Sequence, residues 1–446
     1  MLLKFIMLLV SWTNLLSIGG VDRISNLPDP LICHILSFIP TKQSVATSIL
    51  STRWKPLWTM VPALDFEDTE KRDQRYHDNN NRMTFIHFVC GVLAVRKPVP
   101  LKKFKLQLIS PNQSIHFHVR AWIYYAIRHG VEEIDVRLFL RRPFELPQCV
   151  FSCKSLEIMT LYGMVVLNCH SESVYLPKVK HLRLLKVKYA NEDSFHSLLT
   201  GSPHLQKLSV WTDQQDDTMA LNICHPTVEW LSAIIEAQDH RFKLEINVPN
   251  LKFLNLVDSI FQYDLMNKVV KATFDLFEDE QQASDLEKYS HLLGPLADAH
   301  TLTLQYAKSP CFDFSLPMLN NLRSLQLQVR CCQWHLLPNL LESAPNLVNL
   351  IINKEDTEGP HELSWTEPLH VPKCLELRIR RISILQFRSL EHEVKLIKYI
   401  LKNAKVLEIM DILTGLSDLE ESHHIFKIIS ELPKGSSACK LFLLNN

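Results

Sequence analysis

A short apolar pattern repeats along the chain from residue 131 to residue 352. In each copy an apolar residue is followed by a second after three positions and by a third after five. Nine clear copies start at positions 131, 156, 179, 205, 228, 251, 299, 322 and 347. The first five steps are 25, 23, 26, 23 and 23 residues, and a degenerate copy at Lys271, Phe274 and Leu276 divides the long gap into steps of 20 and 28. Such even spacing predicts a stack of similar units.

Each copy predicts one short strand whose inward side chains cannot be covered within the copy. Neighbouring copies therefore have to stack and bury a continuous ladder. Steps of this size are typical of leucine-rich repeats. The alternative, an ordinary α/β domain with leucine-rich strands, requires the spacing to be accidental. Most copies lack an asparagine at the turn, so we expect an irregular leucine-rich-repeat solenoid over residues 97–370.

Side chains alternate along a strand, so the residues between and after the inward leucines face away from the ladder. This outward row mixes tryptophan, tyrosine and arginine, which are enriched at protein interfaces. The alternative is that its two tryptophans pack against neighbouring loops. We expect the row to bind a target protein, and its candidate residues are Arg137, Tyr162, Arg183, Lys207, Trp211, Trp230, Phe253, Gln326 and Asn349.

Residues 22–58 predict three short helices ahead of the repeats. Asp29 is the expected cap of the first, and Pro30 suits its first position, where an N–H would have no helical partner. Apolar residues then recur at three- and four-residue steps. Thr41 is the expected cap of the second helix, and Ser51 begins the third. The segment holds two tryptophans and many aliphatic side chains.

Chains below about 40 residues rarely fold alone. We therefore expect the apolar excess of this segment to be covered from outside it. Either the rest of this chain or another protein can provide that cover, and composition alone leaves both open.

The segment resembles an F-box, in the form found in plant F-box proteins with leucine-rich repeats. The matching residues are Leu27-Pro28, the run ICHILSFIPTK from Ile32 to Lys42, Ala46-Thr47-Ser48, Leu50-Ser51, Arg53-Trp54 and Leu57-Trp58. Pro30 departs from the usual acidic residue. The resemblance implies a three-helix module over residues 21–64 that binds a Skp-family adaptor, and through it the cullin scaffold of an SCF ubiquitin ligase. The adaptor contacts that it implies are Leu27, Pro28, Ile35, Leu36, Phe38, Ile39, Val45, Ile49, Leu50, Trp54, Leu57 and Trp58.

The segments around this module are less regular. Residues 1–20 form an apolar run with one lysine and no clear cleavage site, which we interpret as a start-site extension or a doubtful signal sequence. Residues 65–96 predict a charged loop and a linker helix. A strand is expected over residues 101–106 and a helix over residues 116–128.

Residues 371–446 have a different pattern from the repeats. Strands are expected over residues 371–376, 406–409 and 439–444, with one helix over residues 391–403 and another around residues 425–429. The segment resembles the FBD domain that ends many plant F-box/leucine-rich-repeat proteins. The resemblance lies in the run from Lys398 to Leu407 and in Leu432-Pro433 with Gly435-Ser436-Ser437. We interpret it as an α+β cap over the last repeat, because terminal repeats need a polar outer face for solubility.

Little in the sequence indicates chemistry. The 48 basic and 48 acidic residues balance to a formal net charge of +0, so no global field attracts nucleic acid or an anionic membrane. No nucleotide-binding glycine motif, H-E-x-x-H motif or nucleophile elbow is present. The metal candidates with the best composition lack a full ligand set. They are Cys149 with Cys153, Cys331-Cys332 with His335, and His423-His424.

The fold expected from the sequence is α/β: a three-helix F-box, an irregular leucine-rich-repeat solenoid and a C-terminal α+β FBD domain. The function implied by the F-box resemblance is that of a non-catalytic receptor subunit in the nucleus or cytoplasm, where the ligase scaffold is found. No cofactor or metal is expected. Eleven scattered cysteines agree with a reducing compartment. Two alternatives stay open: a repeat scaffold that does not engage the ligase, and a receptor for a small molecule in the repeat groove.

Overall fold

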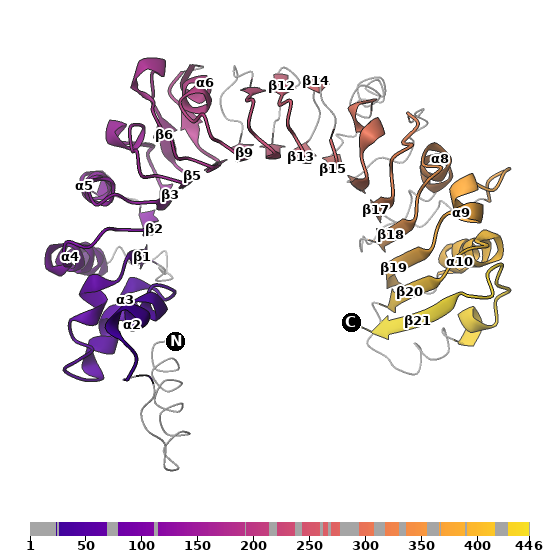
Figure 1. Ribbon diagram of the computed structural model, residues 1–446, viewed down its shortest axis with the longest axis horizontal. Coiled ribbons are helices and arrows are strands. Elements are labelled where there is room, and N and C mark those ends of the chain that lie inside the picture. The colour runs from indigo at the N-terminus through magenta and orange to yellow at the C-terminus, as the bar shows by residue number, and fades with distance from the viewer. Residues whose placement is uncertain are drawn as a thin grey trace, which may run out of the picture. The chain divides into compact units, whose positions relative to one another are not determined.

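The computed structural model describes residues 24, 26–68, 79–110, 115–191, 193–213, 221–236, 243–258, 262–265, 269–276, 294–306, 317–329, 336–354, 365, 367–388, 390–414 and 427–445. The expectation for residues 1–20 lies outside them. The chain divides into two compact units, residues 1–205 and residues 206–446. Within each unit, helices lie along one side of a parallel β-sheet (Figure 1).

The first unit begins with the helical module. Its elements are α2 (Asp29–Leu36), α3 (Thr41–Ala46), η1 (Thr47–Ile49) and η2 (Leu57–Met60), of which the last two are 3-10 turns. The expected third helix is therefore only a short turn, beginning directly after Pro56. The predicted caps are also wrong, because Asp29 and Thr41 are the first residues of their helices and neither helix has a side-chain cap.

The sheet of the first unit has five strands in sequence order, all parallel. They are β1 (Ala63–Glu67), β2 (Lys103–Ser110), β3 (Glu133–Leu140), β5 (Ile158–Gly163) and β7 (His181–Leu185). The helices of the unit are α4 (Asn79–Val95), α5 (Ile115–Arg128) and α6 (Asp193–Thr200). A small second sheet joins β4 (Phe144–Glu145), β6 (Val165–Leu167) and β8 (Lys188–Tyr189).

The repeat pattern sets the strand register. Phe104, Ile134, Met159 and Leu182 pair across four neighbouring strands, and each is 0% exposed. The inward residues of successive copies therefore form the predicted continuous ladder.

The second unit continues the same construction. Its sheet contains β9 (Lys207–Asp213), β11 (Trp230–Glu236), β13 (Phe253–Asp258), β15 (Lys271–Leu276), β16 (Thr301–Tyr306), β17 (Ser324–Val329), β18 (Asn349–Lys354), β19 (Arg381–Phe387), β20 (Ile409–Thr414) and β21 (Lys440–Asn445). Its helices are α8 (Leu336–Ser343), α9 (Lys373–Leu377) and α10 (Glu391–Asn403), with a 3-10 turn η6 (Gly294–Asp298). A small sheet joins β10 (Leu221–Cys224), β12 (Lys243–Asn247) and β14 (Gln262–Leu265).

The structure contains the degenerate copy as a strand of the ladder, but the copy starts two residues earlier than predicted. Ala272 pairs with the inward Leu254, whereas Lys271 pairs with the outward Phe253. The copy therefore begins at Val269, which is fully buried like Ala272. The small alanine at an inward position hid the frame in the sequence.

The C-terminal segment differs most from its prediction. A strand was expected over residues 371–376, but α9 begins directly after Pro372. The three strands β19, β20 and β21 are parallel and extend the ladder of the repeats, with Ile352, Ile384 and Ile412 in one row. Helix α10 has the expected bounds. These strands therefore continue the parallel ladder beyond β18.

Candidate functional site

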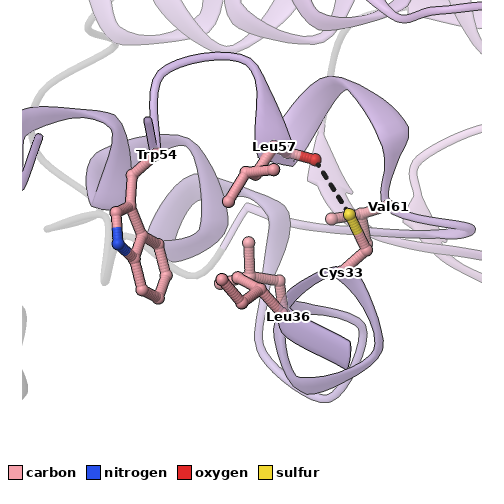
Figure 2. Close-up of a cluster of buried hydrophobic side chains, with 6 residues drawn as sticks. Cys33, Leu36, Trp54, Leu57 and Val61 are labelled. Carbon is pink, nitrogen blue, oxygen red and sulfur yellow. Dashed lines mark hydrogen bonds between the residues drawn. The ribbon is translucent and has the colours of Figure 1, made fainter. Parts of the chain in front are cut away.

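The helical module has a small core of its own. Ile32, Cys33 and Leu36 of α2 pack with side chains from the turns that follow, and the whole cluster lies within residues 32–61 (Figure 2). Trp54 is 7% exposed and Leu57 is 1% exposed. The expectation that the segment cannot bury its apolar side chains by itself is therefore wrong for these residues.

Two polar contacts tie α2 to the later part of the module. The Cys33 thiol donates to the Leu57 carbonyl at 3.5 Å, and burial raises the pKa of this thiol, so it stays a neutral donor (Figure 2). At the start of α2, the Arg53 guanidinium donates to the Asp29 carboxylate at 2.8 Å and also to the Leu27 carbonyl. Asp29 is thus an ion-pair partner where the sequence predicted a cap.

Apolar side chains on the other side of α2, and in the turn after it, are exposed in the part of the chain that the structure describes. Leu31, Ile35 and Phe38 recur at steps of four and three residues, and they are 50%, 49% and 75% exposed. Ile49 and Leu50, which end the next helical turns, are 73% and 43% exposed. We call these five residues the open apolar face. Several large apolar side chains exposed on one short module indicate a candidate site for binding another molecule.

The twelve residues proposed from the F-box resemblance divide into three groups. The exposed group is Pro28, Ile35, Phe38, Ile49 and Leu50. The half-buried group is Leu27, Ile39, Val45 and Trp58. The buried group is Leu36, Trp54 and Leu57.

The buried group belongs to the core of the module and contributes to its fold. Leu31 is exposed on the same side of α2 as Ile35 and is not one of the twelve, although its spacing of four residues from Ile35 is visible in the sequence.

The module is fixed to the first strands of its unit by buried polar contacts. Arg96, 7% exposed at the end of α4, donates to the Val61 carbonyl at 3.2 Å and to the Val99 carbonyl at 2.7 Å. The Thr41 hydroxyl accepts from the Asp65 N–H at 2.8 Å. These contacts join the helices to β1 and to the linker before β2, so the open apolar face has a defined orientation on this unit.

The outward face of the first strands is lined by ion pairs. Lys103 pairs with Glu133 at 2.7 Å, and Lys105 pairs with Asp65 at 3.2 Å. Arg137 donates to both carboxylate oxygens of its strand neighbour Asp135, at 2.9 and 3.0 Å. These three cations of β2 and β3 are therefore compensated within the face. Of the predicted target-facing residues here, Arg137 and Tyr162 are half-buried and Arg183 is exposed.

The outward face of the second unit carries an aromatic stack. Trp230 of β11 and Phe253 of β13 are register partners, with ring centroids 5.3 Å apart and an interplanar angle of 2°. The Lys271 ammonium of β15 lies 5.5 Å from the centroid of the Phe253 ring. Of the other predicted residues, Lys207 and Asn349 are exposed, and Trp211 and Gln326 are half-buried. Trp230 therefore stacks on Phe253 of the neighbouring strand, whereas the alternative predicted that it packs against a loop.

The C-terminal helix α10 is attached to the repeats by a buried ion pair. The Lys354 ammonium at the end of β18 donates to the Glu393 carboxylate at 2.9 Å, and their side chains are 5% and 3% exposed. The second Glu393 oxygen accepts from the N–H groups of Arg388 and Leu390. This carboxylate thus holds the first turn of α10 against the strand ladder.

The described residues show little that could carry out chemistry. Burial raises the pKa of Cys169 to about 11 and that of Cys374 to about 12, so both thiols are protonated and weakly nucleophilic at neutral pH. Within the described ranges, no cluster of three histidine, cysteine or acidic residues is arranged to hold a metal ion. The same ranges contain no helix with the length and apolarity to cross a membrane. Cys331, Cys332, His335, His423 and His424 lie outside them.

Three family models match the chain in order. The F-box domain model matches residues 24–64, the model described as "FBD-associated F-box protein At5g56370, LRR repeats" matches residues 119–274, and the FBD model matches residues 367–412. The first model covers the helical module with the open apolar face. The last covers α9, β19, α10 and most of β20.

Curated relatives from Arabidopsis thaliana match nearly the whole chain. The F-box/FBD/LRR-repeat protein At4g26340 is 29% identical over 434 residues, which are 94% of this chain and 99% of the relative. The F-box/FBD/LRR-repeat protein At1g78750 is 28% identical over 456 residues, or 95% and 96% of the two chains. The FBD-associated F-box protein At1g66310 is 27% identical over 453 residues, again 95% and 96%.

Proposed function

We propose that the chain, which matches the F-box, leucine-rich-repeat and FBD models in order, is a substrate-recognition subunit of a cullin-type SCF ubiquitin ligase. Its F-box would bind a Skp-family adaptor, and its repeats would bind a target protein. The single observation that carries the adaptor half of this proposal is the open apolar face. The ligase scaffold implies a location in the nucleus or cytoplasm.

The open apolar face fits a protein partner because its side chains lie outside the buried core of the module. Trp54 and Leu57 fill the module's own core, so Phe38 and Ile49 are not needed to hold the helices together. Burying such side chains against a partner removes apolar area from water, at roughly 25 cal/mol per Å². Polar side chains at these positions would serve the fold of the module equally well.

The proposed role of the chain in ubiquitin transfer is positional. Tethering a target to the ligase raises its effective concentration, and a rigid connection also fixes the orientation of the target. Arg96 and Thr41 supply such a connection between the F-box and the first strands. We propose that the F-box occupies residues 21–64, the irregular leucine-rich repeats residues 97–370 and the FBD residues 371–446.

The test is adaptor binding by the full-length chain. We expect Phe38→Ala together with Ile49→Ala to weaken binding to a Skp-family adaptor by at least about thirtyfold, because a buried interface anchor contributes about 2 kcal/mol or more. Phe117→Ala is the matched control, since Phe117 on α5 is also 75% exposed. Its binding should equal that of the unmodified chain. Unchanged binding in the double variant, with the fold intact by circular dichroism, would reject the proposal.

A further inference from the structure

The strands β9, β11, β13 and β15 align four outward side chains in one row. Register pairing places Lys207 beside Trp230, Trp230 beside Phe253, and Phe253 beside Lys271. We call these four residues the lysine–aromatic row. Both lysines are exposed, and both aromatic side chains are half-buried. All four belong to the second unit.

The stacked rings present their edges outward. One face of Phe253 is covered by Trp230 and the other by the Lys271 ammonium, because β11 and β15 flank β13. The edge of an aromatic ring is electropositive, whereas its face is electronegative. The row therefore presents two ammonium groups with electropositive ring edges between them.

In the part of the chain that the structure describes, the two lysines of this row lack the carboxylate partners that lysines of the first unit have. On β1, β2 and β3, Lys103 and Lys105 each have a carboxylate partner. Among the residues that the structure describes, no carboxylate lies within ion-pair distance of Lys207 or Lys271. The acidic residues of the four strands come four to six positions further along each strand, about 13 to 20 Å away, and the nearest is Asp275 on β15.

The neighbouring positions offer hydrogen bonds without adding charge. Two residues further along the strands the outward side chains are Ser209, Ser232, Asn255 and Thr273, and the Asn255 amide donates to the Ser232 hydroxyl at 3.0 Å. A peptide lying across these strands therefore meets anion-binding groups along one edge and neutral polar groups along the next.

We propose that the lysine–aromatic row binds an extended acidic segment of the target protein, with carboxylates at positions i and i+4. Three inter-strand steps of about 4.8 Å separate β9 from β15, about 14 Å in all. Four residues of an extended chain span about 13 to 14 Å and point both acidic side chains to the same side. In a helix the same two positions lie only about 6 Å apart, which does not match the two lysines. This inference rests on the proposed role of the repeats as the target-binding region.

The test uses the full-length chain and fluorescein-labelled peptides that contain the sequence Glu-Ala-Val-Ala-Glu between Gly-Ser linkers. We expect this peptide to bind about tenfold more tightly than its Ser-Ala-Val-Ala-Ser counterpart, since each exposed ion pair contributes a factor of about two to five. A peptide with glutamates at i and i+2 should lose most of that advantage. The advantage should also fall as salt is added, because exposed charges are screened.

Variants of the chain identify the site. Lys207→Gln with Lys271→Gln should remove the tenfold preference, and Lys207→Glu with Lys271→Glu should reverse it in favour of a Lys-Ala-Val-Ala-Lys peptide. Lys252→Gln is the matched control, because Lys252 is exposed but already paired with Glu229 at 2.8 Å. Equal binding of acidic and neutral peptides, or an acidic preference that survives both double variants, would overturn the inference. Adaptor binding is measured separately, so its loss or retention does not affect this result.

Discussion

The F-box and the strand ladder use the same aliphatic residues in opposite ways. In the ladder, an inward leucine of an inner strand is covered by the copies on either side, as Leu325 is by Leu302 and Leu350. In the F-box, α2 buries Ile32 and Leu36 on one side and leaves Leu31 and Ile35 in solvent on the other. A repeat that stacks can close its core from within the chain. A short helical module can close only one side, and its other side is available to a partner.

The largest expected loss of stability comes from substituting the buried side of the F-box, and the exposed side should show almost none. Trp54→Ala removes a buried side chain from a small core, so we expect a loss of about 3 to 5 kcal/mol in the free energy of unfolding of the module. Phe38→Ala removes an exposed side chain and should change this free energy by less than about 0.5 kcal/mol. Hydrogen exchange of the α2 and α3 amides in the full-length chain measures both. Equal protection in the two variants would contradict the division into a core and an open face.

The second prediction concerns the end of the ladder. Glu393→Ala leaves the Lys354 ammonium buried without its partner, and breaking a buried pair in this way costs about 3 to 5 kcal/mol. We expect early exchange of the α10 amides and a lower unfolding midpoint. Glu391→Ala is the control on the same helix, because the Glu391 side chain is 85% exposed. If the two variants unfold alike, Glu393 does not hold α10 on the ladder.

The ladder was predictable from the sequence because its apolar period coincides with its strand register. Leu325 and Leu327, for example, alternate with polar residues, so the pattern itself indicates which side of the strand is inward. Only the copy at Ala272 was misread, since an alanine gives a weak signal. The strand expected after Val371 failed for a different reason: Pro372 starts a helix there, and the alternation of apolar residues is too short to exclude one.

The F-box could be recognised from the sequence, but its two sides could not be told apart. Helix α2 is apolar nearly all round, so its period does not distinguish Ile32 from Leu31 or Leu36 from Ile35. Trp54 looks like an interface anchor from its residue type, yet its position between α2 and the following turns makes it core. The lysine–aromatic row needed the register of four strands, because its members are 18 to 23 residues apart in sequence.

The third prediction tests whether the ladder is closed. Leu325→Ala opens a cavity between two neighbouring copies, so we expect a loss of about 2 to 5 kcal/mol. Thermal unfolding of the full-length chain should show a lower midpoint for the second unit. The control is Gln326→Ala, one residue along on the outward face, which should leave the midpoint nearly unchanged. A similar midpoint for both variants would mean that the ladder is not the main source of stability.

The smallest expected effect concerns the ion pair at the start of α2. Arg53 and Asp29 are 39% and 51% exposed, so water and salt screen their attraction, and their coupling should be only about 0.2 to 1 kcal/mol. A double-mutant cycle with Arg53→Ala and Asp29→Ala measures this coupling apart from the additional bond that Arg53 donates to the Leu27 carbonyl. The coupling should shrink further in high salt. A coupling well above 1 kcal/mol would show that the F-box depends on a surface charge pair for its fold, and its comparison with the ladder would then have to include electrostatics as well as apolar packing.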